Sequence, residues 1–334
     1  MMNDLQKTLV ARGFEAWCDT EHDTEDAKKL YSNFENVFFR VKGVDGEYHM
    51  PNSTKRIKAP PMVTRLCEYE HPDIIMTFNG EPFFSIEITN ATPFSGANPV
   101  QRFPRAVKAA ELGIPNIELA PWISNPTPAT ARGVRARLKL MEIYKSPSLS
   151  ILFEYNNDKS FVKQFNFLKK RIETSINLLD EEEIEAAKTF LPIDEEIITH
   201  MKEFCQRAQE SGNESFHQVE IKEDYIKINI DLTGRRRYED TKTGWETKGT
   251  GLLDPYPGYI LAYDFILCRT GPKITDRKRK IFVHFRNLPR TVESQEDNPA
   301  TWWIMRAKES KGYIYWNLIE KFSDGIIFKD EKLP

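Results

Sequence analysis

Alternation of apolar and polar residues predicts a β-hairpin between residues 73 and 89. Residues 73–78 and 83–88 are each dominated by β-branched and aromatic side chains, as strands usually are. The four residues between them, Asn79-Gly80-Glu81-Pro82, have the composition of a turn. Because side chains alternate between the faces of a strand, the hairpin has one apolar and one more polar face. The polar face carries Asp73, Thr77, Ser85, Glu87 and Thr89.

Two registers of this hairpin remain open from the sequence. A four-residue loop places Asp73 opposite Ile88, whereas a two-residue turn at Asn79-Gly80 places Asp73 opposite Ile86. Either register brings Glu87 within one residue of Asp73. Two carboxylates on one face of a hairpin suit Mg²⁺ and a phosphate, although an edge hairpin with a solvated polar face is the alternative.

After the hairpin, helical and strand patterns alternate. Helical spacing covers residues 100–112 and 129–144, and apolar runs at 114–119 and 149–154 predict strands. This order favours an α/β (α+β) fold with a mixed central β-sheet flanked by helices. Apolar positions at helical spacing continue over 158–179, and we expect further helices over 181–190 and 194–208.

Length and composition indicate more than one domain. The chain has 334 residues, which exceeds the size at which single hydrophobic cores stop growing. Residues 211–215, Ser-Gly-Asn-Glu-Ser, are typical of a linker, and short strands and loops rich in Gly and Pro follow. We expect a core domain over 1–155, a helical acidic connecting region over 156–212 and a β-rich C-terminal domain over 216–334.

The hairpin and the helix after it resemble the PD-(D/E)xK nuclease superfamily, which has the restriction-endonuclease-like fold. The matching residues are Pro72-Asp73, Glu87-x-Thr89 and Gln101, and the resemblance covers roughly residues 25–155. It implies that Asp73 and Glu87 are metal ligands for Mg²⁺ or Mn²⁺, joined by an acid of an upstream helix, for which Glu35 is the candidate. It also implies that Gln101 and Arg102 lie beside the scissile phosphate.

Thr89 departs from the family pattern, in which a lysine usually stands at this position. Threonine offers a hydroxyl group but no positive charge. A cation on the next helix can replace the lysine, and Arg105 and Lys108 lie four and seven residues after Gln101, near one helical face with it. The letters Glu246-Thr247-Lys248 also match E-x-K, but no apolar strand leads into them.

Charge is distributed unevenly along the chain, although the net charge is only −3. Residues 101–145 hold eight Lys/Arg against three acids, and residues 235–290 hold thirteen against six. Two such stretches suit opposite walls of a cleft for a polyanion, or they are solvated faces. The residues expected to contact DNA are Arg102, Arg105, Arg235, Arg236, Arg237 and Lys248.

The combined expectation is a Mg²⁺-dependent endonuclease of the restriction type that acts on DNA, and a symmetric target would suggest a homodimer. One alternative is a non-catalytic nucleic-acid-binding protein on the same fold. Another is a protein-interaction module that uses residues 180–224, with fourteen acids against four bases. The four cysteines are scattered, and neither a signal region nor a membrane-length apolar run is present, so a cytoplasmic protein is expected.

Overall fold

The computed structural model describes the chain in several stretches and divides it into two compact units, Met1–Gly212 and Asn213–Pro334. The described residues are 14–34, 37–43, 46–51, 53–69, 71–89, 97–122, 128–177, 195–210, 218–230, 237–241, 244–248, 279–286, 289–290, 323–329 and 331–333. Within these residues, no helix has both the length and the apolar character needed to cross a membrane.

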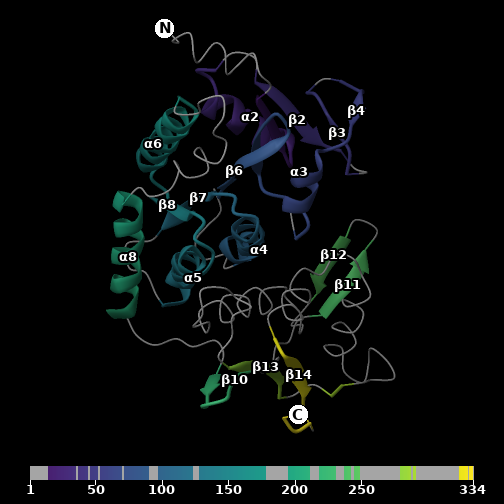
Figure 1. Ribbon diagram of the computed structural model, residues 1–334, viewed down its shortest axis with the longest axis vertical. Coiled ribbons are helices and arrows are strands. Elements are labelled where there is room, and N and C mark those ends of the chain that lie inside the picture. Colours follow the sequence, from purple (N-terminus) through teal and green to yellow (C-terminus); the bar gives the residue numbers. More distant parts are fainter. Residues whose placement is uncertain are drawn as a thin grey trace. The chain divides into compact units, whose positions relative to one another are not determined.

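The first unit is built on an eight-stranded mixed sheet, in the order β4-β3-β2-β1-β5-β6-β7-β8 (Figure 1). The strands are β1 (Phe14–Cys18), β2 (Phe38–Lys42), β3 (Tyr48–His49), β4 (Arg56–Ile57), β5 (Ile74–Phe78), β6 (Glu81–Ile88), β7 (Asn116–Trp122) and β8 (Ser148–Glu154). β5 runs antiparallel to β1 and β6, whereas β6, β7 and β8 are parallel. The carboxyl ends of β6, β7 and β8 therefore lie at one edge of the sheet, together with the beginning of β5.

Helices connect and cover these strands, which confirms the predicted α/β class with a mixed sheet flanked by helices. They are α2 (Glu21–Leu30), α3 (Pro61–Leu66), α4 (Ala97–Glu111), α5 (Pro128–Tyr144), α6 (Asp158–Asn177) and α8 (Glu195–Glu210). Long parallel connections of this kind usually pass through a helix, as α4 does between β6 and β7.

Both faces of the sheet centre are buried. On one face, Ile74, Met76 and Ile86 belong to a large core that includes Leu168 of α6 and Met201 of α8. On the other, Ile75 packs in a smaller core with residues of β1, β3, α3 and α4. The described helices of the sequence region 156–212 thus share the core of the strands that precede them. The hairpin is not an edge element, and its polar face is covered.

The hairpin adopts a register between the two expected ones. Asn79 and Gly80 form the turn, with φ angles of 51° and 83°. Thr77 pairs with Pro82, but Met76 pairs with Phe84 and Ile74 with Ile86, because β6 contains a bulge of one residue. Extended by one residue, this register places Asp73 opposite Glu87.

The second unit contains a four-stranded sheet in the order β14-β13-β10-β9 and a separate hairpin β11-β12. The strands are β9 (Gln218–Ile221), β10 (Tyr225–Ile230), β11 (Arg237–Thr241), β12 (Gly244–Lys248), β13 (Lys280–Phe285) and β14 (Gly325–Phe328). Glu246-Thr247-Lys248, into which no apolar strand leads in the sequence, lies within β12, which pairs with β11 in an antiparallel ladder. The predicted helix 181–190 and the residues 249–278 lie outside the described part.

Candidate active site

Asp73 and Glu87 come together at the sheet edge where β5 begins and β6 ends. Asp73 directly precedes β5, and Glu87 is the next-to-last residue of β6. Both are buried, with Asp73 5% and Glu87 0% exposed. The Oδ2 atom of Asp73 accepts a hydrogen bond from the backbone N–H of Ile88 at 2.8 Å, which ties the two strand ends together. The face predicted to be polar therefore presents two adjacent carboxylates.

Arg105 of α4 binds both carboxylates with one nitrogen. Its Nη1 atom lies 2.8 Å from Oδ1 of Asp73 and 2.7 Å from Oε2 of Glu87. Charge-assisted bonds of this length are among the stronger interactions in a protein. They offset the desolvation of two buried carboxylates, which is costly for any unpaired buried charge. One guanidinium against two carboxylates leaves the triad with a formal charge of −1.

The position of Nη1 bears on whether these residues fit a divalent metal ion. One oxygen from each carboxylate faces a single point, and a positive nitrogen fills that point. Carboxylate oxygens are the ligands that Mg²⁺ and Mn²⁺ prefer, so the pair fits in donor type and convergence. Within the described stretches, no three His, Cys, Asp or Glu side chains gather as a metal-ligating group. Glu35, the expected third acid, lies outside the described residues.

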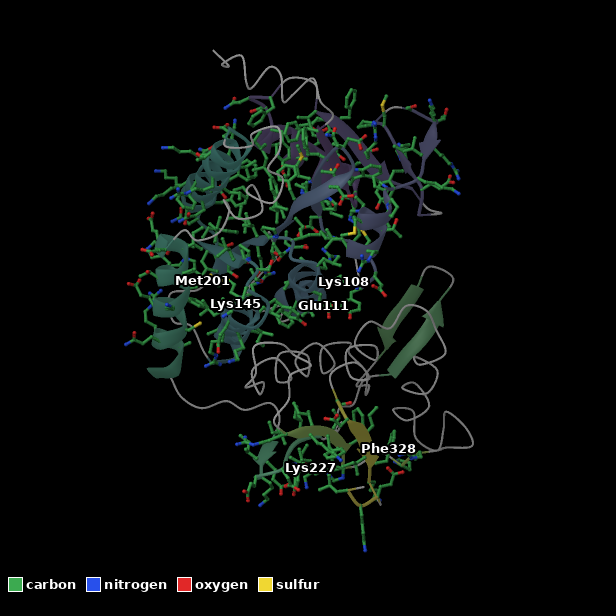
Figure 2. The ribbon with its side chains drawn as sticks, in the orientation of Figure 1. Lys108, Glu111, Lys145, Met201, Lys227 and Phe328 are labelled. Carbon is green, nitrogen blue, oxygen red and sulfur yellow. The ribbon has the colours of Figure 1, made fainter. Side chains whose placement is uncertain are left out.

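The remaining residues of the expected site are distributed differently. Thr89 is buried beside Glu87, and its backbone N–H donates to the carbonyl of Leu119 at 2.9 Å. Lys108 forms ion pairs with Glu68 and Glu111 and lies 5.1 Å from the ring centre of Tyr69. Lys108 and Glu111 lie next to each other on α4 in Figure 2. The structure thus brings Arg105, and not Lys108, to the two carboxylates.

Several predicted residues fall where side chains are not described. Gln101 and Arg102 are in α4, one turn before Arg105, and only their helical backbone is described. Arg237 and Lys248 are register partners in the β11-β12 hairpin. Arg235 and Arg236 lie outside the described residues.

A second buried acid–arginine pair, which the sequence reasoning missed, lies on the next strands. Glu118 of β7 is the register partner of Glu87, and Nε of Arg137 in α5 lies 3.1 Å from its Oε2 atom. Arg137 also donates to Asn116 at 2.5 Å, and Ser150 donates to Glu118 at 3.3 Å. The sequence did contain a signal for this pair. Asn116 and Glu118 alternate with apolar residues along their strand, as the polar residues of β6 do, so they are expected on the same face of the sheet.

Two ionisable groups beside Asp73 have shifted pKa values. Burial lowers the pKa of His71 to about 4, so its imidazole is neutral at pH 7. Its Nδ1 atom contacts the carbonyl of Pro72, which places the proton on Nδ1 and the lone pair on Nε2. Burial also raises the pKa of Asp23 to about 6, and the negative charge of Asp73 adds to this increase. Burial is thus the main cause of both shifts, and the charges of Asp73 and Arg105 act in addition to it.

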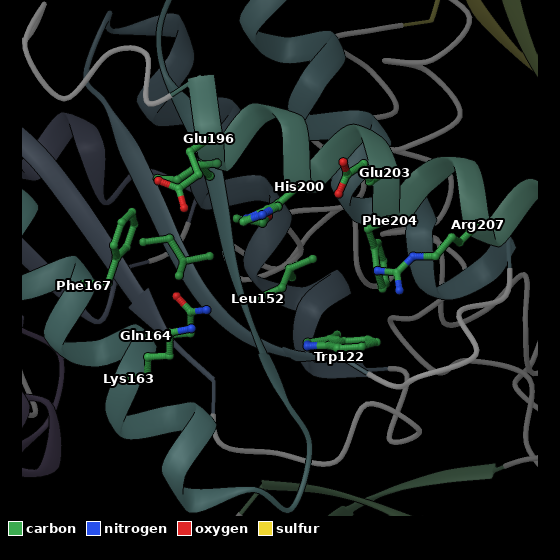
Figure 3. Close-up of a pocket in the computed structure, with 13 residues that line it drawn as sticks. Trp122, Leu152, Lys163, Gln164, Phe167, Glu196, His200, Glu203, Phe204 and Arg207 are labelled. Carbon is green, nitrogen blue, oxygen red and sulfur yellow. The ribbon is translucent and has the colours of Figure 1, made fainter.

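A separate pocket of about 280 Å³ lies between α6, α8, the end of β7 and the middle of β8 (Figure 3). Its aromatic wall is Trp122, with the guanidinium of Arg207 5.2 Å from the ring centre and Phe204 edge-on. Charged side chains of both signs line it, namely Lys163, Arg207, Glu196 and Glu203. This balance does not favour a polyanion, and the pocket belongs to the opposite side of the sheet from Arg105 by its contacts with the large core.

No protein-family model, curated protein or solved structure matches this chain.

Proposed function

We propose that this protein is a metal-dependent DNA endonuclease of the restriction type, with its active site in the first unit. The observation that carries the proposal is the convergence of Asp73 and Glu87 on one cation position, which Arg105 fills. The resemblance of Pro72-Asp73 and Glu87-x-Thr89 to the PD-(D/E)xK motif supports it. A homodimer with two such sites suits the cleavage of both strands of a symmetric target.

Each residue of the triad has a distinct role in the proposed reaction. Asp73 and Glu87 would hold the divalent cation with their carboxylate oxygens. The bound cation supplies Lewis-acid stabilisation of the phosphate and a more acidic water. Arg105 supplies the positive charge that the family usually takes from a lysine at the position of Thr89. Its side chain is 12% exposed, and it gives up the carboxylates to stabilise the charge that develops on the phosphate.

The energetic cost of this arrangement favours a functional role over a purely structural one. Apolar residues of similar volume often stabilise a protein as well as a buried ion pair does. This chain instead places two carboxylates at adjacent strand ends under one guanidinium, at the edge where parallel strands end. Ligands of open α/β sheets bind outside the carboxyl ends of the strands, so this location suits a site.

Cleavage of duplex DNA by the full chain in Mg²⁺ tests the proposal. Asp73→Asn and Glu87→Gln keep the shape of each side chain but remove a charged ligand, and we expect each to reduce the rate at least ~100-fold. Glu118→Gln is the matched control, because it neutralises a buried glutamate on the next strand that bonds to a different arginine. Equal cleavage by wild type and Asp73→Asn refutes the site.

A non-catalytic nucleic-acid-binding protein is the second candidate. Thr89 and the occupation of the carboxylates by Arg105 favour it, because both are consistent with a site that has lost its chemistry. The same assay separates the two functions. Salt-dependent DNA binding without cleavage in either Mg²⁺ or Mn²⁺ identifies the non-catalytic protein.

A further inference from the structure

A basic extension of the sheet lies next to the candidate active site. This extension, called the wing below, comprises β2, β3, β4 and α3, within residues 37–66. The segment holds six lysines and arginines against two acids, a local balance of +4 in a chain whose net charge is −3. Its cations are Arg40, Lys42, Lys55, Arg56, Lys58 and Arg65. Such local excess of positive charge is the usual footprint of a phosphate-binding surface.

An open groove of about 920 Å³ runs along the wing. Lys42, Lys58 and Arg65 line it, together with the carboxylates of Glu47 and Glu68. Each of these acids already has a cationic partner: Arg56 lies 3.7 Å from Glu47, and Lys108 pairs with Glu68. Lys58 and Arg65 are exposed, and neither forms an ion pair with any acid in the part of the chain that the structure describes. Among the residues that the structure describes, the acids of the groove therefore leave the positive charge of Lys58 and Arg65 unneutralised.

The buried end of the groove reaches the candidate active site. His71, which is 4% exposed, lines the groove two residues before Asp73. Asp19 connects the two places, because its carboxylate bonds Lys42 at 2.9 Å and its backbone N–H donates to the carbonyl of Asp73 at 3.1 Å. Arg105 is near enough to shift the pKa values of both His71 and Cys67, which line the groove. Groove and triad thus share one face of the sheet.

His71 places a buried hydrogen-bond acceptor at this end of the groove. Its Nδ1 atom contacts the carbonyl of Pro72, so Nε2 carries the lone pair. Among the described residues, Nε2 has no hydrogen-bond partner although it is buried. A buried acceptor of this kind usually has a partner. Because a phosphodiester has no proton to donate, the partner that fits is a water molecule held between Nε2 and the strand.

We propose that the wing groove binds the phosphate backbone of a DNA strand and leads it to Asp73, Glu87 and Arg105. Lys58 and Arg65 contact phosphates in the groove, and Lys42 lies where the strand approaches Asp19 and Asp73. The inference deepens the proposed function and rests on it for the identity of the strand. It adds a surface that adjoins the carboxylates to the DNA contacts expected from the sequence, which lie on α4 and in the second unit.

Binding of a fluorescently labelled DNA duplex to the full chain, measured by anisotropy in EDTA over a series of salt concentrations, tests the groove. EDTA prevents cleavage, so that binding is measured alone. The test variant is Lys58→Ala/Arg65→Ala. The matched control is Lys170→Ala/Lys202→Ala, which removes two exposed positive charges from α6 and α8. These helices pack on the large core, on the other face of the sheet.

We expect the groove variant to bind about tenfold more weakly and to reduce the slope of log K against log[salt] by about 2, since each phosphate contact contributes ~0.9. The control should change neither quantity by a comparable amount. Equal losses in the two variants, wild-type binding by the groove variant, or no DNA binding by wild type each overturn the inference.

Different experimental results would refute the DNA-binding groove and the proposed endonuclease chemistry. If wild type cleaves DNA, Asp73→Asn does not, and the groove variant binds normally, the groove is wrong and the endonuclease stands. If the groove variant loses affinity but wild type never cleaves in Mg²⁺ or Mn²⁺, the groove stands and the chemistry is wrong.

Discussion

Arg105 is the residue on which both the stability and the chemistry of the site depend. Among the residues that the structure describes, Arg105 is the cation that lies within hydrogen-bonding distance of both Asp73 and Glu87. Arg105→Met keeps much of the side-chain volume but leaves two buried carboxylates without their shared cation. Removing one partner from a buried ion pair costs about 3 to 5 kcal/mol. We expect urea unfolding to show a loss of that size in the free energy of unfolding.

Arg56→Met is the matched control for this prediction. Its ion pair with Glu47 has side chains that are 62% and 38% exposed. Exposed pairs contribute about 0 to 1 kcal/mol, so this variant should unfold almost as wild type does. Equal destabilisation by the two substitutions would show that Arg105 does not neutralise buried charge.

His71 gives the protein a specific dependence on pH. Its folded pKa is about 4, below the ordinary value of 6.5, because burial disfavours the imidazolium. The unfolded chain therefore takes up a proton first as the pH falls. Stability from this group is complete above pH 6.5 and is lost as the pH falls toward 4, by roughly 3 kcal/mol.

His71→Asn should flatten this dependence, because asparagine retains a donor for the carbonyl of Pro72 but does not titrate. The measurement is the free energy of unfolding of wild type and variant at pH 7 and pH 4. His22→Asn serves as the control, since the side chain of His22 is 74% exposed. A variant whose stability falls as steeply as that of wild type would rule out His71 as the cause.

The sequence could predict which carboxylates meet, but not which cation serves them. Period-2 alternation placed Asp73 and Glu87 on one face, and the buried pair is found there. Arg105 and Lys108 are three residues apart on α4 and were equally plausible. The choice depends on Glu68, which lies far away in sequence after α3 and pairs with Lys108. Such long-range partners leave no periodic signal.

At the scale of elements, the turn and bulge of the hairpin set the geometry of the site. Gly80 has a φ angle of +83°, in the left-handed region that disfavours residues with a Cβ atom. Gly80→Ala should therefore destabilise the protein by about 1 to 2 kcal/mol. Chemical denaturation measures this loss.

Asn79→Gly is the control in the same turn, because glycine readily adopts the φ angle of 51° found at Asn79. It should change stability by no more than about 0.5 kcal/mol. If Gly80→Ala is as mild as Asn79→Gly, the turn does not require a positive φ angle at Gly80.

Long elements with regular periods were predictable, and short ones were not. The helix expected over 158–179 spans Asp158–Asn177 in the described residues, and the strand expected over 149–154 spans Ser148–Glu154. By contrast, β3 and β4 have two residues each, so alternation cannot reveal them. The register of the hairpin was also unpredictable in detail, because the bulge beside Pro82 adds one residue that no composition rule signals.

At the scale of the whole molecule, α6 and α8 decide where the first unit ends. The sequence suggested a core domain that stops at residue 155, with these helices in a connecting region. The structure packs Leu168, Ile172, Met201 and Phe204 of these helices into the same core as β5 and β6. The apolar spacing of a helix shows that the helix has an apolar face. It does not show which sheet that face packs against, and the boundary of the unit depends on this packing.

This packing predicts how fragments of the chain behave. Every residue of the two cores of the first unit lies before residue 212, so the fragment 1–212 contains all of its described core. We expect this fragment to unfold cooperatively in urea with native near-UV circular dichroism. The fragment 1–155 lacks α6 and α8 and exposes the apolar face that they cover. It should bind hydrophobic dyes and lose cooperative unfolding.

The two fragments also separate the contributions of the two units to DNA binding. If the wing groove is the main grip, the fragment 1–212 retains salt-dependent binding, and Lys58→Ala/Arg65→Ala weakens it by the same factor as in the full chain. If basic residues of the second unit such as Arg235–Arg237 also bind the same DNA, the full chain binds more tightly than the fragment, because linked sites raise the effective concentration. A folded fragment without DNA affinity would place the entire grip in the second unit.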